Sequence, residues 1–302
     1  MISLLRRLLD VNVRTVGDAR EASGTGLLGA APEDPSLKQA GGPADLSAPR
    51  PREAVRQLRT NLTYVSIDTP PRVTAFTSAN PGEGKSTVVS SLARALAEAG
   101  QRVILIDADL RRPSQADIFQ IEGRVGLSEV LAGQIAVEDA IQEVGEDGLV
   151  ILPAGRTPPN PSELLGSGRM RSLLKELEKE FLVLIDAPPV LPVTDSTLLA
   201  AAVDGTVLVV RHGKTRKDHV EVAREMLDAV QANILGFVLN GTPAKGVGHD
   251  YNGGGYGSSS KAYAAYLERP GDDLEVTDAE NRETTGGTLP TRRESVRRGQ
   301  GR

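Results

Sequence analysis

One short stretch, Ala79–Thr87, constrains the possible folds of this chain more than any other part of its sequence. It reads Ala-Asn-Pro-Gly-Glu-Gly-Lys-Ser-Thr, follows a β-branched apolar run at 73–77 and precedes a helix-forming run at 88–97. The order of strand, glycine-rich loop and helix matches the P-loop pattern G-x-x-x-x-G-K-[ST], with Ala79 in place of the first Gly. Backbone N–H groups of such a loop, together with the positive end of the helix dipole, bind phosphate. The sequence therefore predicts a nucleotide phosphate site.

Two residues of this loop have specific expected roles. Lys85 is expected to reach the β- and γ-phosphates, and Ser86 is expected to bind Mg²⁺. The other predicted nucleotide-binding residues are Asn80, Pro81, Gly82, Glu83, Gly84 and Thr87. The alternative is a glycine-rich turn that binds nothing, and the Gly-Lys-Ser triplet in its strand–helix context disfavours that alternative.

The composition narrows the class of protein. The chain has 302 residues, a net charge of −5 and a pI near 5.4, so electrostatics do not favour a nucleic-acid partner. It contains no Cys, which excludes disulfides, thiolate metal sites and iron–sulfur clusters. No apolar run has the length of about 18–20 residues that a membrane span needs, and no signal peptide is recognisable. We therefore expect a cytoplasmic protein.

Short apolar runs alternate with helical patterns along the middle of the chain. The predicted strands are 73–77, 103–106, 148–152, 182–185, 206–210 and 234–239. The predicted helices between and after them include 126–131, 136–144, one that begins at Glu163 with Ser162 as its N-cap, 169–180 and 220–231. Strands that are apolar on both faces suit a parallel sheet covered on both sides. The sequence thus predicts an α/β fold with a doubly wound, mostly parallel sheet, in which ligands bind at the carboxyl ends of the strands.

The ends of the chain have a different composition. Residues 17–51 are rich in Gly, Ala and Pro without periodicity, so we expect residues 1–50 to be a disordered segment before a domain at 51–245. Residues 1–10 have the pattern of a short amphipathic helix, and a frayed terminus and a helix that docks on a partner or membrane both remain open. Residues 246–268 carry four of the five tyrosines, and 269–302 is expected to be a disordered tail.

Three charged residues recur at a spacing of three near the start of the predicted domain. Glu53, Arg56 and Arg59 lie on one side of a predicted helix, opposite the apolar residues Val55, Leu58 and Leu62. Periodicity alone favours an ordinary solvent-exposed face for the three charges.

Three aspartates follow two of the predicted buried strands. Asp186 ends the strand at 182–185, as a Walker B carboxylate does, while Asp107 and Asp109 follow the strand at 103–106. A carboxylate in this position usually holds Mg²⁺ directly or through water. Alternation places the side chains of Asp107 and Asp109 on the same side of the chain, so one can bind Mg²⁺ while the other accepts a proton. The alternative for each is a carboxylate that caps the next turn.

Several blocks of sequence resemble one known family, the bacterial tyrosine kinases of capsule and exopolysaccharide synthesis. Ala79–Thr87, Asp107–Pro113 and Ile185–Pro189 look like the Walker A, A′ and B motifs of that family. Further blocks that resemble it are Leu152–Gly155, Pro158–Leu165, Pro192–Asp195 and Gly236–Asn240. The resemblance covers about residues 50–266. It implies a P-loop NTPase fold, the cofactors ATP and Mg²⁺, and non-specific protein-tyrosine kinase activity that regulates polysaccharide polymerisation and export.

The resemblance also implies roles for individual residues. The predicted catalytic residues are Lys85, Asp107, Asp109 and Asp186; the predicted Mg²⁺ ligands are Ser86, Asp109 and Asp186. Glu53, Arg56 and Arg59 occupy the place of the family's ring-forming motif, so the resemblance reverses the interpretation of a solvent-exposed face. Tyr251, Tyr256, Tyr263 and Tyr266 occupy the place of its tyrosine cluster, which is phosphorylated in trans.

The resemblance implies partners as well. These are further copies of the chain in a ring, a membrane-anchored polysaccharide co-polymerase that activates the kinase and recruits it to the inner face of the membrane, and a tyrosine phosphatase. Nucleic acid is not among them. One departure is Ala187, which stands where the family usually has Ser or Thr.

The alternative function is that of a MinD/ParA-type ATPase, a spatial organiser with the same fold. Its signature lysine would lie five residues before Lys85, where this chain has Asn80, and it gives no reason for a tyrosine cluster.

Overall fold

The computed structural model of the chain describes its folded core. The described ranges are 11–33, 49–66, 69–145 and 147–243. The predictions for residues 1–10, for the four clustered tyrosines and for the tail after them lie outside these ranges.

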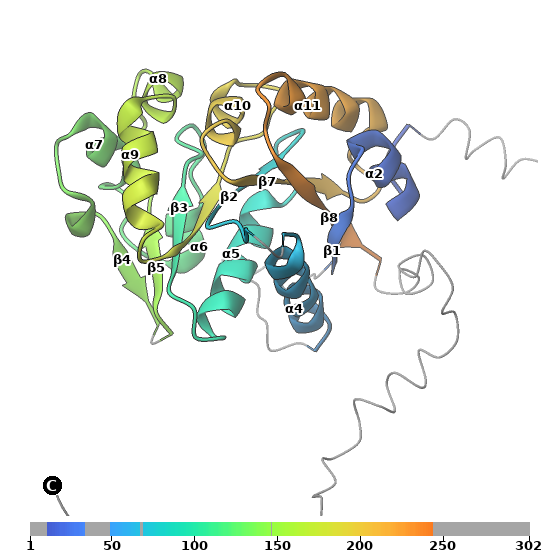
Figure 1. The fold of residues 1–302 in the computed structure, drawn as a ribbon, viewed down its shortest axis with the longest axis horizontal. Helices are drawn as coiled ribbons and strands as arrows, with labels where there is room; N and C mark the ends of the chain where they lie inside the picture. Colours follow the sequence, from blue (N-terminus) through green and yellow to red (C-terminus); the bar gives the residue numbers. More distant parts are fainter. Residues whose placement is uncertain (1–10, 34–48, 67–68, 146, 244–302) are drawn as a thin grey trace, which may run out of the picture. The chain divides into compact units, whose positions relative to one another are not determined.

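An eight-stranded sheet forms the centre of the described structure (Figure 1). Its strand order is β1-β8-β7-β2-β6-β3-β5-β4. The strands are β1 Leu27–Pro32, β2 Val73–Ser78, β3 Val103–Asp107, β4 Gln142–Val144, β5 Leu149–Leu152, β6 Leu182–Asp186, β7 Gly205–Arg211 and β8 Ile234–Thr242. Neighbours are parallel except β4 and β5, which are antiparallel. The predicted doubly wound, mostly parallel α/β sheet is confirmed, and all six predicted strands are present in it.

Helices cover both faces of this sheet. They are α2 Val16–Ser23, α4 Pro49–Tyr64, α5 Lys85–Ala97, α6 Gln115–Phe119, α7 Leu127–Ala132, α8 Pro161–Leu165, α9 Gly168–Leu177, α10 Asp195–Ala200 and α11 Lys217–Ala229, with a 3₁₀ turn at Val137–Asp139. Helices α4, α5 and α6 pack on one face, where Val103 and Leu105 of β3 point. Helices α7 to α11 and α2 pack on the other, where Ile104 and Ile106 point. Burial of both faces explains why β3 is a continuous apolar run.

The structure differs from the prediction of a disordered segment before residue 51. Residues 16–23 form α2, with a capping box between Thr15 and Asp18, and residues 27–32 form β1. Strand β1 pairs in parallel with β8 at the edge of the sheet, and Pro32 is tolerated there because it ends an edge strand. Buried Val13 and Val16 join the core beneath α11. The prediction of a disordered segment was therefore wrong for residues 16–32.

A second difference lies at 136–144, which was predicted to be helical. The structure has only the 3₁₀ turn there, followed by β4, whose Gln142–Val144 pair with Leu149–Ile151 of β5. Tertiary pairing with an exposed sheet edge overrides the helix propensity of this segment.

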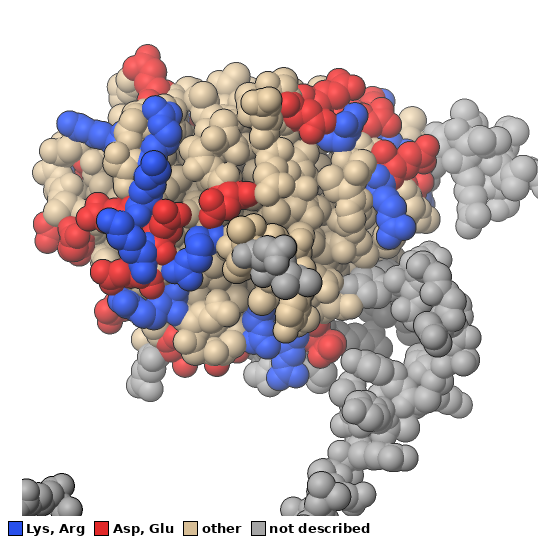
Figure 2. Space-filling model, in the orientation of Figure 1, with Lys and Arg blue, Asp and Glu red and all other residues tan. Residues whose placement is uncertain are grey.

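The face of the molecule that Figure 2 shows carries charges of both signs. Around α9, basic and acidic side chains are interspersed (Figure 2), with exposed Arg171 and Lys175 close in sequence to exposed Glu176 and Glu180. Within the described ranges, no helix combines the length and apolarity that crossing a membrane requires.

Candidate functional site

The P-loop lies at the carboxyl end of β2, in the middle of the sheet. Strand β2 ends at Ser78 and α5 begins at Lys85, so the predicted strand, loop and helix are confirmed. Gly82 and Gly84 have φ values of 76° and 90°, a region that favours glycine. The unpaired N–H groups of the first turn of α5 face the place where phosphate binds in such loops.

Gly84 is required for a second reason, because strand β8 passes very close to it. A Cβ atom at Gly84 would lie 1.9 Å from Nδ2 of Asn240 in β8. That Nδ2 donates to the carbonyl oxygen of Glu83 at 2.9 Å. Strand β8 is therefore hydrogen-bonded directly to the P-loop backbone.

The sheet brings the predicted carboxylates together beside this loop. Asp107 at the end of β3 is in register with Asp186 at the end of β6, and β6 is the neighbour of β2. The Lys85 Nζ atom lies 2.9 Å from Asp109 Oδ2 and 3.4 Å from Asp186 Oδ1. All four predicted catalytic residues are buried in one cluster.

Lys85 carries its charge within this cluster. Burial alone would lower the pKa of Lys85. The nearby Asp186 and Asp109 carboxylates have the opposite and larger effect, so the pKa of Lys85 is raised above its ordinary value. The described residues include no ready-made group of three or more acidic or His ligands for a metal. Instead the ammonium group of Lys85 bridges Asp109 and Asp186, which need a cation because they are buried. These two carboxylates, together with the hydroxyl of Ser86 on the first turn of α5, are a donor set that fits Mg²⁺.

Asp107 also has a structural role. Its Oδ2 accepts hydrogen bonds from the backbone N–H groups of Ser114 and Gln115, both at 2.9 Å, and its Oδ1 accepts from Asp109 N at 3.2 Å. The capping alternative therefore holds for this residue. Burial raises the pKa of Asp107 from the ordinary 3.8 to about 7, with a further rise from the Asp186 carboxylate and an opposing effect of the N–H donors. A carboxylate with this pKa can exchange a proton near neutral pH.

Gln115 is a residue of the site that sequence reasoning missed. It is fully buried at the start of α6, and its Nε2 donates to Asp186 Oδ2 at 2.7 Å. Its Oε1 accepts from the Ser90 hydroxyl of α5 at 2.7 Å. Gln115 thus links Ser90 of the P-loop helix α5 to Asp186 and orients the Asp186 carboxylate. A single glutamine carries no sequence pattern that would reveal this.

Asp195 was missed in the same way, and it explains three of the sequence blocks singled out above. Its buried carboxylate accepts from Arg111 Nε and Nη2 at 2.9 and 3.3 Å, and from the Ser162 hydroxyl at 2.5 Å. This bidentate pair joins the loop after β3 to α8 and α10. Ser162 is consequently not the N-cap of α8; the N-cap is Asn160, with Pro161 in the first turn.

The predicted ring-forming residues lie on α4, away from the carboxylate cluster. Val55, Leu58 and Leu62 are buried as predicted. Glu53 and Arg56 are exposed, whereas Arg59 is half-buried and donates to the carbonyl oxygen of Ala95 near the end of α5 at 3.2 Å. Arg59 therefore already has a role within the subunit.

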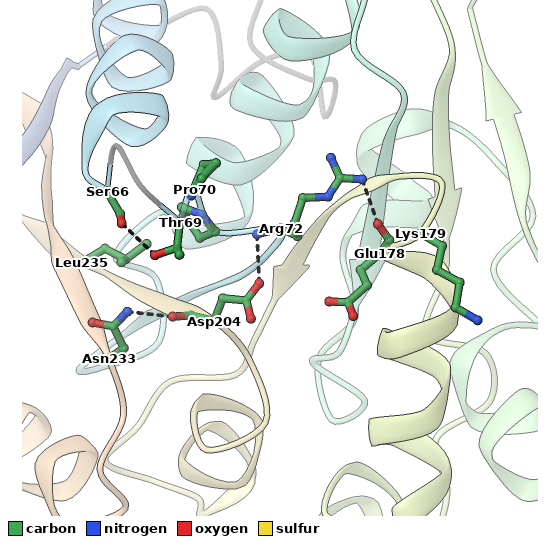
Figure 3. A pocket seen from close by; sticks show the side chains of 10 residues that line it. Ser66, Thr69, Pro70, Arg72, Glu178, Lys179, Asp204, Asn233 and Leu235 are labelled. Atoms are coloured by element: carbon green, nitrogen blue, oxygen red, sulfur yellow. Dashed lines mark hydrogen bonds between the residues drawn. The ribbon is translucent and has the colours of Figure 1, made fainter.

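A separate pocket of about 680 Å³ lies at the amino ends of the strands, which is the opposite edge of the sheet from the P-loop (Figure 3). The Asp204 carboxylate accepts from the backbone N–H groups of Arg72 and Val73, and Asn233 donates to the Asp204 carbonyl. The Arg72 guanidinium donates to the carbonyl of Glu178, while the Lys179 side chain points away from it (Figure 3). These hydrogen bonds connect the segments that precede the strands, and the polar groups bond to one another instead of pointing together into the pocket.

Comparison with known proteins gives matches in sequence and in structure. Residues 72–231 match the family model described as an AAA domain. The chain is 42% identical over 190 residues to tyrosine-protein kinase YwqD of Bacillus subtilis (strain 168), which covers 63% of this chain and 80% of YwqD. It is 40% identical over 190 residues to tyrosine-protein kinase etk of Escherichia coli (strain K12), covering 63% of this chain but only 26% of that relative.

The structure is likewise similar to a solved kinase domain. The kinase domain of Escherichia coli tyrosine kinase ETK superposes with a TM-score of 0.71 at 32% identity, covering 80% of this chain and 97% of that domain. This structural match covers 80% of the chain, whereas the sequence matches to YwqD and etk each cover 63% of it.

Proposed function

Because this chain belongs to the family of bacterial tyrosine-protein kinases, we propose that it transfers the γ-phosphoryl group of ATP to tyrosines of its own C-terminal segment. The observation that carries the proposal is the contact of Lys85 Nζ with Asp109 and Asp186 at the P-loop. The name of YwqD supports tyrosine as the acceptor. The proposed role of the cycle is to regulate polymerisation and export of an exopolysaccharide or capsule.

Each residue of the cluster has a proposed task in this reaction. Lys85 leaves the two carboxylates and binds the phosphates. Ser86, Asp109 and Asp186 would hold Mg²⁺, which would supply neutralisation of the phosphate charge. Asp107 accepts the proton of the tyrosine hydroxyl as the bond from its oxygen to the γ-phosphorus forms. The bond from that phosphorus to the β,γ-bridging oxygen breaks, and ADP leaves. Gln115 keeps Asp186 in position throughout.

The organiser ATPase is the less favoured alternative. The place of its signature lysine is taken by Asn80, whose side chain bonds within the subunit to Glu83 and His219. The named relatives are tyrosine-protein kinases.

Replacement of Tyr251, Tyr256, Tyr263 and Tyr266 by Phe tests the acceptor assignment. We expect the variant to bind nucleotide normally and to lose nearly all self-labelling by [γ-³²P]ATP, because Phe lacks the accepting hydroxyl. Tyr64→Phe is the matched control, since Tyr64 is the exposed tyrosine at the end of α4. Strong residual phosphotyrosine mapped to Tyr64 would contradict the assignment.

Further proposed partners are a membrane-anchored co-polymerase, which activates the kinase and recruits it to the membrane, a tyrosine phosphatase, and other copies of the chain. Phosphates on the four tyrosines would add about −6 to −8 charges to each tail at neutral pH. Repulsion between such tails favours disassembly of a ring. Dephosphorylation would then restore the assembled, active form.

A double substitution on α4 tests the proposed assembly. Glu53→Ala/Arg56→Ala should shift the dephosphorylated, nucleotide-bound protein to monomers in light scattering and lower trans-phosphorylation, because both side chains are exposed and available to a neighbour. Arg59→Ala is measured separately, since its contact with Ala95 makes it part of the subunit's own packing. Arg171→Ala/Glu176→Ala on α9 is the charge-matched control. An unchanged oligomer distribution in the double variant would rule out this surface.

A further inference from the structure

The side chain of Glu83 connects the P-loop to a segment outside it. Glu83 is buried, and its two carboxylate oxygens accept from Asn80 Nδ2 at 3.0 Å and from Asn80 N at 3.2 Å. A further donor comes from outside the loop: the hydroxyl of Thr215 donates to Glu83 Oε1 at 2.7 Å. Burial raises the pKa of Glu83, and the hydrogen bonds from Thr215 and Asn80 oppose that rise. The ionised carboxylate therefore depends on these donors.

The orientation of Asn80 follows from the same contacts. Its Nδ2 faces Glu83, so its Oδ1 faces Nδ1 of His219 on α11, at 3.1 Å. Since Oδ1 accepts only, the His219 tautomer that fits carries its hydrogen on Nδ1. Glu83 is thus held by Thr215, which lies between β7 and α11, and Asn80 is held by His219 in the first turn of α11.

Thr215 itself is fixed inside this segment. It is buried, and its Oγ1 accepts from the backbone N–H of Arg211 at 2.8 Å while its hydroxyl hydrogen goes to Glu83. A hydroxyl has one hydrogen to donate, so the N–H of Arg211 fixes the direction of that donation.

The N-terminal segment 11–18 holds the backbone around Thr215. An antiparallel bridge joins Asn12 to Arg216, with Val13 N donating to Thr215 O at 2.8 Å and Lys217 N donating to Val11 O at 2.8 Å. An ion pair of 2.6 Å between Lys217 Nζ and Asp18 Oδ1 adds a side-chain contact, and α2 packs against α11 (Figure 1). Residues 11–18, which were expected to belong to a disordered segment, therefore contact Thr215 and Lys217, and Thr215 in turn contacts Glu83 of the P-loop.

We propose that Thr215 is a positioning residue of the nucleotide site, which fixes the P-loop through Glu83, and that residues 11–18 keep Thr215 in place. The inference rests on the proposed binding of nucleotide at residues 79–87. A P-loop fixed in advance presents its N–H groups without reorganisation when phosphate arrives. Loosening Thr215 should therefore weaken nucleotide binding while the carboxylate cluster stays intact.

The main experiment compares Thr215→Val with Thr215→Ser in the full chain. Binding of N-methylanthraniloyl-ADP with Mg²⁺ is measured by fluorescence, together with the thermal midpoint of unfolding. Thr215→Val removes the hydroxyl at nearly constant shape, and we expect the Kd to rise about tenfold, which corresponds to about 1.4 kcal/mol. Thr215→Ser restores the hydroxyl and should bind within about twofold of the unchanged chain. A Kd for Thr215→Val equal to that of the unchanged chain would overturn the proposal.

A second variant tests the role of the N-terminal segment and does not alter Thr215. Lys217→Met breaks the ion pair with Asp18, and the partly exposed geometry gives an expected rise in Kd of about two- to threefold. Lys214→Met in the same loop is the control, because its side chain is exposed. In the Thr215→Val background, Lys217→Met should have no further effect, since the path it acts through is gone. Equal effects in both backgrounds would overturn the coupling.

The same probe separates this inference from the proposed function. Lys85→Met should lose binding of N-methylanthraniloyl-ADP if the probe occupies the P-loop. Unchanged binding by Lys85→Met would overturn the proposed nucleotide site itself. Lost binding by Lys85→Met combined with unchanged binding by Thr215→Val would overturn only the role of Thr215.

Discussion

Replacing Lys85 by Met is expected to abolish phosphotyrosine formation, with a loss of at least about 10²–10³-fold in turnover. Lys85 is the cation that the P-loop directs at the phosphates, and the uncharged Met side chain cannot stabilise the charge that develops there. The measurement is a quantitative immunoblot for phosphotyrosine or transfer of label from [γ-³²P]ATP under single-turnover conditions.

The contacts of Lys85 with two carboxylates give a second expected effect of the same substitution. Without Lys85, the buried carboxylates of Asp109 and Asp186 lose the ammonium group that lies between them. Removing one partner of a buried ion pair costs about 3 kcal/mol or more of unfolding free energy at neutral pH. Urea unfolding at neutral pH should therefore show a destabilised variant.

A matched control separates these effects from the loss of any lysine. Lys175→Met on α9 removes an exposed lysine and should leave both turnover and stability unchanged. The activity assay is run below the unfolding midpoint of Lys85→Met, so that folded protein is compared with folded protein. Native turnover in folded Lys85→Met would contradict the proposed role of this lysine.

The parts of the fold that were predictable are those where local pattern and tertiary position agree. Strands β3 and β6 are buried on both faces, so their sequences are continuous apolar runs that end in Asp107 and Asp186. The P-loop is readable because its glycines and Lys85 are required by backbone conformation and chemistry together.

The parts that were not predictable depend on distant partners. The Leu-Leu-Gly-Ala-Ala-Pro sequence of β1 has little strand propensity and becomes a strand because β8 offers it an unpaired edge. Gln115 and Asp195 acquire their roles from Asp186 and Arg111, which are 71 and 84 residues away in the chain. Periodicity within a short window contains no information about such pairs.

Asp107→Asn is expected to retain nucleotide binding and to lose about 10²–10⁴-fold of turnover, the range typical for removal of a general base. Asn keeps an oxygen that can accept from the N–H groups of Ser114 and Gln115, so the turn before α6 can persist. What it loses is the capacity to take a proton from a tyrosine hydroxyl, whose ordinary pKa is about 10. Asp117→Asn, an exposed residue of α6, is the matched control.

The raised pKa of Asp107 gives this prediction a pH dependence with a defined sign. With a pKa of about 7, Asp107 is protonated and inactive as a base below that pH, so kcat/KM should rise with pH through about 7 and then level off. The same shift means that the folded state holds a proton that the unfolded chain has released above the ordinary 3.8. The stability of the nucleotide-free protein should therefore fall as pH rises between about 4 and 7. In Asp107→Asn the ascending limb of the rate profile should disappear, which pre-steady-state rates from pH 5.5 to 8.5 would reveal. A native rate in this variant, with the ascending limb retained, would assign the proton transfer to another group.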